Sequence, residues 1–219
     1  MKMIVEIENL TKTYTQGHEQ ILVLEDINLC LRPGEFISVV GPSGSGKSTL
    51  LNLIGLLDNV YSGSIKLFSR SVSSLDEEEK AKMRLENIGF VFQFDSLLEE
   101  FTVIENIEMP ARILGKPDAN FSKALLEKFG LLEIADKFPM DISGGEKQRA
   151  AVLRALRNGP SLLIADEPTG NLDRYNSKIV LEDLKKASFR GTSVIMVTHN
   201  EEAAKYAERI YHLSDGKLK

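Results

Sequence analysis

The chain has 219 residues, 42% of them hydrophobic and 27% charged, and its formal net charge is −5. That length suits one sizeable core or one domain with a subdomain, and the acidic balance argues against a nucleic-acid partner. The single cysteine, Cys30, excludes a disulfide framework, and no apolar run approaches the roughly 18 residues that cross a bilayer. Charges come too early in the chain for a signal peptide, so we expect a cytoplasmic protein that reaches a membrane only through a partner.

The first part of the chain alternates strand patterns with one glycine-rich loop. Apolar and polar residues alternate over 3–10 and 21–31, which predicts two strands, with a turn region over 11–20. Residues 36–40 are almost wholly apolar, as is typical of a parallel strand buried on both faces. This strand leads into the glycine-rich loop at 41–49, and helical spacing follows over 49–54.

The glycine-rich loop has the order strand, loop, helix that a phosphate-binding P-loop needs. Its glycines allow successive backbone N–H groups to point at one spot, where the helix N-terminus adds its dipole. Lys47 would supply a positive charge to the β- and γ-phosphates, and the Ser48 hydroxyl would be a ligand for Mg²⁺. The residues that we assign to nucleotide binding here are Gly41, Ser43, Gly44, Ser45, Gly46, Lys47, Ser48 and Thr49.

The middle of the chain changes from strands to helices. Strands are predicted over 62–68 and 88–92, the second ending at Gln93, and Asp76 is placed to cap a charged helix over 76–86. From 94 to 157 there is hardly any strand pattern, which predicts an inserted helical subdomain. Its helical stretches fall at 103–114, 120–129 and 146–157.

The last part returns to alternating strands and helices. Strands are predicted over 162–165 and 193–197, helices over 176–187 and 201–207, and a closing strand pair over 210–218. This alternation predicts an α/β fold with a mostly parallel core sheet, and the first strands predict an antiparallel flank. We expect one domain, with a core of residues 1–93 and 158–219 and a helical subdomain at about 94–157.

Two adjacent acids follow the apolar run at 162–165, at the strand end where open α/β sheets bind ligands. Successive side chains of a strand point in opposite directions, so Asp166 and Glu167 must have different roles. Asp166 would orient the Mg²⁺ ion, and Glu167 would be the general base for the attacking water.

A second anion site is predicted about a hundred residues after the glycine-rich loop. Ser143 is placed to cap the helix that begins near Glu146, and Gly144 and Gly145 expose backbone N–H groups beside it. A plain helix cap explains Ser143 alone but not the whole string at 141–149. The two anion sites could meet within one chain, or each could complete the other across a symmetric dimer.

These motifs resemble those of the ATPase subunit of an ABC transporter, and the resemblance covers essentially the whole chain. Tyr14 stands where this family places an aromatic ring that stacks on adenine. The subgroup that the chain resembles handles lipoproteins, macrolides or antimicrobial peptides, and the resemblance rests on residues 166–173 and 101–107. Residues 41–49 match the Walker A loop, Gln93 the Q-loop, 142–148 the signature motif, 162–167 the Walker B strand, Asn171-Leu172-Asp173 the D-loop, and His199 the H-loop.

The chain departs from the family in its signature motif, where Ile142 replaces the usual Leu and Glu146 the frequent Gln. The first change conserves volume, and a Glu near a helix N-terminus is compatible with the dipole. Lys47, Glu167 and His199 are all present, so nothing suggests a degenerate site.

The resemblance implies a homodimer that closes head to tail on two ATP molecules, each between the P-loop of one chain and the signature motif of the other. Glu167, His199 and Gln93 would then be catalytic, with His199 on the γ-phosphate and Gln93 sensing it. Mg²⁺ would be held by Ser48, Gln93 and Asp166. The nucleotide would also involve Tyr14, Ser143, Gly144, Gly145 and Asp173.

The family's partner is an integral membrane permease, which docks a short helix in a groove near Gln93, lined by residues around 94–101. The expected function is therefore the motor of an exporter or extractor at the cytoplasmic face of the membrane. One alternative is a membrane complex that signals or regulates envelope processes without transport. A soluble ATPase acting on nucleic acid or ribosomes is disfavoured, because such relatives carry a coiled-coil insertion or tandem ATPase domains.

Overall fold

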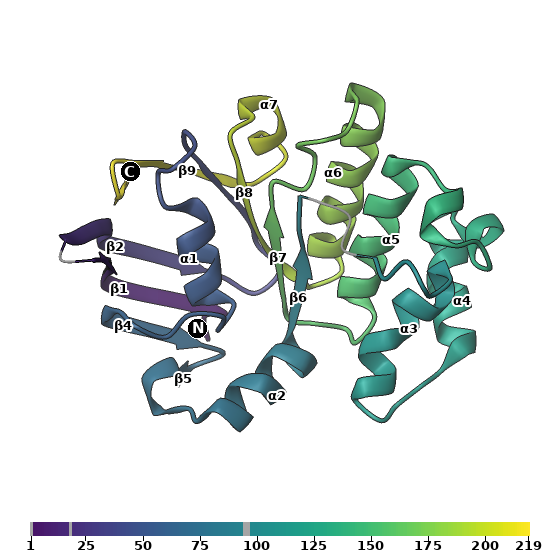
Figure 1. Ribbon diagram of the computed structural model, residues 1–219, viewed down its shortest axis with the longest axis horizontal. Coiled ribbons are helices and arrows are strands. Elements are labelled where there is room, and N and C mark those ends of the chain that lie inside the picture. Colours follow the sequence, from purple (N-terminus) through teal and green to yellow (C-terminus); the bar gives the residue numbers. More distant parts are fainter. Residues whose placement is uncertain (1, 18, 94–96) are drawn as a thin grey trace.

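The computed structural model describes residues 2–17, 19–93 and 97–219, which form two sheets surrounded by helices (Figure 1). The larger sheet has the strand order β10-β9-β3-β8-β7-β6, and its neighbours pair in parallel except β10 with β9. The strands are β3 (Phe36–Val40), β6 (Ile88–Val91), β7 (Leu162–Asp166), β8 (Ser193–Thr198), β9 (Arg209–Ser214) and β10 (Lys217–Leu218).

The centre of this sheet follows directly from its sequence. Every residue of β3 and β8 is buried, and the two strands pair in parallel from Phe36 with Val194 to Val40 with Thr198. Continuous apolar runs are what a strand covered on both faces requires. The mostly parallel core sheet with an antiparallel flank is therefore confirmed.

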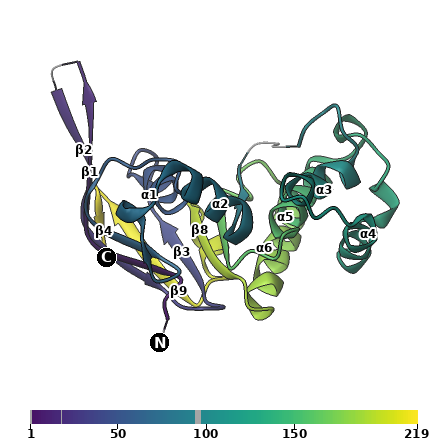
Figure 2. The same ribbon diagram turned by 90° about the horizontal axis from the view of Figure 1, so that it is seen from below.

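The flank is a four-stranded antiparallel sheet with the order β2-β1-β4-β5. Its first two strands form a long hairpin that projects from the rest of the molecule (Figure 2). Its strands are β1 (Val5–Gln16), β2 (Glu19–Leu31), β4 (Ser62–Leu67) and β5 (Arg70–Ser71).

The prediction of a turn region over 11–20 is wrong, because β1 continues to Gln16 and β2 begins at Glu19. Tyr14 pairs with Ile21 across the hairpin, and both side chains are exposed. Neither face of this part of the hairpin is covered, so hydrogen bonds between the two strands hold it together. Because buried and exposed residues do not alternate here, the sequence shows no strand pattern.

The helices of the core pack on the sheets, and one of them begins where its predicted cap places it. Asp76 caps α2 (Glu77–Asn87) with a capping box, in which its side chain accepts a hydrogen bond from the Glu79 backbone N–H. The predicted helix over 201–207 is shorter, since α7 spans only Glu201–Ala204. The other core helices are α1 (Lys47–Ile54) and α6 (Arg174–Phe189), with a single 3₁₀ turn η1 (Val72–Ser74) after β5.

Between β6 and β7, the described residues form helices and turns but no strand, and we call α3, α4 and α5 the helical unit. They share an apolar cluster that includes Val103, Ile107, Leu126 and Leu153. The opposite face of α5 packs on the larger sheet through Val152, so this helix belongs to both layers. The elements are α3 (Val103–Ile113), α4 (Ala119–Lys128), η2 (Leu132–Ile134), η3 (Pro139–Asp141) and α5 (Gly144–Leu156).

Across the described residues, no helix combines the length and apolar character needed to cross a membrane.

Candidate functional site

The glycine-rich loop joins β3 to α1 in a conformation that only glycine adopts easily. Gly44 and Gly46 have φ values of 79° and 101°, in the left-handed region. A Cβ atom on Gly41 would lie 2.1 Å from the backbone oxygen of Leu213, so this position also excludes a side chain. Gly46 is the N-cap of α1, and no side chain caps that helix. The N-terminus of α1 is thus left open for an anion.

Lys47 lies inside the loop that precedes it. Its Nζ donates hydrogen bonds to the backbone oxygens of Gly41 at 2.7 Å and Pro42 at 2.9 Å, and the residue is only 8% exposed. The hydroxyl of Ser45, in the same loop, is buried and has no hydrogen-bond partner among the described residues. A concave loop with a cation and a free hydroxyl has the donors that a phosphate needs. At its rim, Ser43 is exposed.

The two acids at the end of β7 lie next to this loop. Asp166 forms a side-chain hydrogen bond with Ser48 in the first turn of α1. Burial raises the pKa of Asp166, and the negative charge of Glu167 raises it further, against the opposite effects of Ser48 and Lys47. Burial disfavours the charged form of Asp166, and a cation nearby would stabilise that form.

Glu167 is held in a backbone conformation that is uncommon for this residue type, with φ 46°. Its backbone N–H donates to the oxygen of Val197 at 3.0 Å, which fixes the turn after β7 against β8. Its Oε1 lies 2.9 Å from Nδ1 of His199 and 4.0 Å from Nζ of Lys47. Glu167 therefore bridges the loop lysine and the histidine at the end of β8, with its side chain 13% exposed.

Gln93 follows β6 and is packed against the turn that leads from Glu167 into α6. A Cβ atom on Gly170 would lie 2.6 Å from Nε2 of Gln93, and Nδ2 of Asn171 donates to the Gln93 backbone oxygen at 3.3 Å. Gln148 of α5 donates from Nε2 to the oxygen of Phe92 at 2.8 Å. The segment around Gln93 is thus held from the D-loop on one side and from α5 on the other.

The second predicted anion site forms the start of α5. Ser143 is the N-cap, and its backbone N–H and Oγ both donate to Oε2 of Glu146, at 2.8 and 2.7 Å. The first of the two glycines, Gly144, is exposed. None of the hydrogen bonds of Ser143 in the described residues joins it to the glycine-rich loop of the same chain.

The first turn of α6, just after the D-loop, packs directly against this second site. A Cβ atom on Gly145 would lie 2.3 Å from Oδ1 of Asn176, so a side chain at this position would displace Asn176. Asp173 caps α6 by accepting from the backbone N–H groups of Tyr175 and Asn176, at 2.8 and 3.0 Å. Sequence reasoning missed the contacts of Asn176 and of Gly170. The contact of Asn176 could have been suspected from the sequence, because this residue lies in the first helical turn after the Asp173 cap.

Tyr14 lies on the projecting hairpin rather than on a turn. Its hydroxyl donates to Oδ2 of Asp58 at 2.9 Å, and Nζ of Lys12 lies 4.5 Å from the ring centroid. The ring is 40% exposed. The structure thus brings Lys47, Ser48, Asp166, Glu167 and His199 together, sets Gln93 beside the D-loop, and leaves Tyr14 and Ser143 on separate elements.

An apolar groove of about 480 Å³ lies between α2 and α3, behind Phe92. Its walls include Leu57, Phe90, Met109 and Ile113. The groove for the membrane partner was expected to be lined by residues around 94–101. Residues 97–101 do not line this groove, and residues 94–96 lie outside the described part of the chain.

Comparisons with known proteins agree with this geometry. Residues 24–170 match the family model described as ABC transporter. The lipoprotein-releasing system ATP-binding protein LolD of Zymomonas mobilis is 41% identical, over 98% of this chain and 94% of that protein. The macrolide export ATP-binding/permease protein MacB of Salmonella choleraesuis is 42% identical, over 100% of this chain but only 34% of MacB.

A solved structure supports the same assignment. It is a dimeric structure of a post-hydrolysis state of the ATP-binding cassette MJ0796 bound to ADP and Pi. It superposes with a TM-score of 0.88 at 38% identity, covering 98% of this chain and 97% of that one.

Proposed function

The chain belongs to the ABC transporter family and is an ATP-binding ATPase, and from this premise we propose that it drives a membrane complex that exports or extracts its substrate. The observation that carries this proposal is the contact of Glu167 with both Lys47 and His199 at the end of the parallel sheet. The names of the relatives support a cargo among lipoproteins and drug-like molecules such as macrolides.

The chemistry follows from where these side chains lie. The γ-phosphate of ATP would enter the loop beneath α1, taking the hydrogen bonds of Lys47 in place of the two loop carbonyls. Glu167 would then accept a proton from the attacking water, a role that contributes about 10²–10⁴ in rate. His199, held by the Glu167 carboxylate, would contact the same phosphate from the end of β8.

A Mg²⁺ ion fits the oxygen atoms that flank the loop. The Ser48 hydroxyl and the Asp166 carboxylate already lie within hydrogen-bond contact, and the Gln93 amide oxygen is a third candidate ligand. The ion would neutralise charge on the β- and γ-phosphates. The pairing of Ser48 with Asp166 would orient both groups for it.

We also propose that two chains close head to tail, so that Ser143, Gly144 and Gly145 of one chain complete the site of the other. Two observations support this: among the described residues, Ser143 makes no hydrogen bond to its own glycine-rich loop, and the solved relative is dimeric. Tyr14 would stack on adenine, and Asp173 would keep α6 and the D-loop in register with Gly145.

The apolar groove between α2 and α3 would receive a short helix of an integral membrane permease at the cytoplasmic face. Its apolar walls support this, because an amphipathic helix buries its apolar face in such a groove. We further propose that residues 94–157 move relative to a core of residues 1–93 and 158–219 when the groove is filled.

The decisive variant is Glu167→Gln, which keeps the shape of the side chain but removes the base. It should bind ATP with Mg²⁺, lose about 10²–10⁴ in kcat, and elute as a dimer only with ATP. Light scattering after size exclusion, with and without ATP, measures the dimer. Glu127→Gln, on the exposed face of α4, is the matched control. A monomer at saturating ATP would contradict the composite site.

A further inference from the structure

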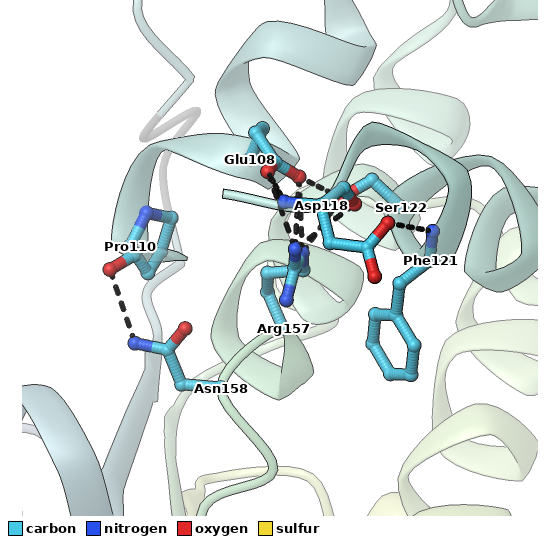
Figure 3. Close-up of polar contacts among 7 residues, drawn as sticks. All are labelled: Glu108, Pro110, Asp118, Phe121, Ser122, Arg157 and Asn158. Atoms are coloured by element: carbon cyan, nitrogen blue, oxygen red, sulfur yellow. Dashed lines mark hydrogen bonds and ion pairs between the residues drawn. The ribbon is translucent and has the colours of Figure 1, made fainter. Parts of the chain in front are cut away.

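The end of α5 carries two neighbouring polar residues, Arg157 and Asn158, that both contact α3, through Glu108 and Pro110 respectively (Figure 3). Arg157 is 7% exposed, and Asn158 is half-buried at the edge of the apolar groove. None of the motifs described above includes either residue. Buried polar groups in native proteins need partners, so their contacts show what these residues hold together.

Arg157 joins three helices of the helical unit. Its Nη2 donates to Oε1 of Glu108 on α3 at 3.2 Å and to the backbone oxygen of Asp118 at 3.0 Å. Its Nε donates to Oγ of Ser122 on α4 at 2.6 Å, and Ser122 in turn donates to Glu108. The guanidinium also lies 4.8 Å from the ring centroid of Phe121. The C-terminus of α5 is thereby fixed to α3 and α4.

Hydrogen bonds within this cluster favour the charged form of Glu108. Burial raises the pKa of Glu108, but hydrogen bonds from Ser122 and Arg157 more than offset burial, so its pKa lies below the ordinary value. Glu108 and Ser122 are 3% and 0% exposed. Because breaking a buried charge pair leaves an uncompensated charge, the cluster resists separation of the three helices.

Asn158 joins the helical unit to the core. Its Nδ2 donates to the backbone oxygen of Leu85 in the last turn of α2 at 3.0 Å and to that of Pro110 on α3 at 3.1 Å. These two helices are the walls of the apolar groove, and all three residues line it. A single side-chain amide therefore sets the spacing of the two walls.

Displacement of the walls would reach the nucleotide site through α5. Both hydrogen bonds of Asn158 come from the same nitrogen, Nδ2, so an occupant that moves α2 and α3 apart must break one of them. The Arg157 cluster makes α3 carry the end of α5 with it. This helix of 13 residues is about 20 Å long, and Ser143 caps its far end.

We propose that Asn158 is a positioning residue whose amide couples occupancy of the groove to the placement of Ser143, and so to closure of the ATP site. The inference rests on the proposed function and adds a named residue that sets the resting geometry. Without that amide, α2 and α3 would sample a range of spacings, and Ser143 would meet the second nucleotide site in the correct place less often.

The test compares Asn158→Ala and Asn158→Asp with the wild type and with Asn120→Ala, a control on the exposed surface of α4. Spin labels at Lys123 on α4 and Lys217 on β10, in a Cys30→Ser background, report the distance between helical unit and core. Both Asn158 variants should broaden this distance distribution. They should also lower kcat about 2–30-fold while the KM for ATP and the Kd for monomeric nucleotide binding stay within about twofold of wild type.

Thermal unfolding of each variant separates positioning from simple loss of stability. A variant with a lower melting temperature but unchanged distances and kcat would overturn the proposal, as would two variants that match the wild type throughout. Should Asn158→Ala not fold, Asn158→Asp, which conserves volume and removes the donor, decides alone. A wild-type chain that fails to hydrolyse ATP would instead refute the proposed function.

Discussion

The two glycine-containing loops of this chain both begin a helix, yet they are built in opposite ways. At the first loop, the N-cap of α1 is Gly46, with φ 101° and no side-chain cap. At the second, α5 starts with a complete capping box, in which Ser143 and Glu146 satisfy each other's backbone N–H groups. One helix N-terminus is open, and the other is already filled by the chain's own carboxylate.

This difference would assign separate roles to the two loops in the proposed dimer. The open N-terminus of α1, with Lys47 beneath it, offers a primary phosphate site by itself. The N-terminus of α5 holds the negative charge of Glu146, so it can act only as an additional contact for a phosphate whose charge other groups already balance. We infer that the first loop binds the nucleotide and the second responds to it.

The largest expected effect falls on the first loop. Lys47→Ala should weaken ATP binding by about 10–100-fold, because it removes charge-assisted hydrogen bonds to the phosphates. Calorimetry with ATP and Mg²⁺ measures the Kd. The control is Lys66→Ala, which removes only a surface ion pair with Glu6. Unchanged binding in Lys47→Ala would remove the distinction between the loops.

A smaller and opposite effect is expected at the second loop. Glu146→Gln keeps the capping geometry and removes the negative charge near the incoming phosphate. In the Glu167→Gln background, it should lower the ATP concentration for half-maximal dimer formation by about 2–5-fold, the size of a helix-terminus charge effect. Size exclusion over an ATP series measures it, with Glu127→Gln as control. A weaker dimer would show that the carboxylate assists the phosphate.

The smallest expected effect is that of Glu146→Gln on how the stability of the protein depends on pH. Hydrogen bonds from Ser143 lower the pKa of Glu146 below its ordinary value of 4.5. A lowered pKa contributes stability that is present above the ordinary value and is lost as the pH falls through the folded-state value. The melting temperature of wild type should therefore exceed that of Glu146→Gln by a few degrees at pH 7, and the gap should close in acid. A gap that is constant with pH would contradict this.

Local patterns predicted much of the fold. The strands β3, β7 and β8 are visible in the sequence as apolar runs, because strands that are buried on both faces need apolar side chains. Asp76 and Ser143 are recognisable as helix caps from their residue type and position. The hairpin end was missed because its pairing needs no buried face.

The site was only partly predictable for a physical reason. Residue types and order identify Lys47, Asp166 and Glu167, since their chemistry depends on local sequence. The left-handed φ of Glu167 and its contact with His199 depend on β7 and β8 lying side by side. The bonds of Asn158 to α2 and α3 join segments 73 and 48 residues away, which no local pattern encodes.

The most direct test asks whether the two loops of different chains meet around ATP. Ser43→Cys and Asp141→Cys, each exposed beside one loop, are placed in separate chains carrying Cys30→Ser and Glu167→Gln. The two chains are mixed and oxidised, and non-reducing gels measure the disulfide-linked product. We predict a linked heterodimer that forms with ATP and Mg²⁺ and is absent without nucleotide. Equal linking with and without ATP, or none in either case, would contradict the account.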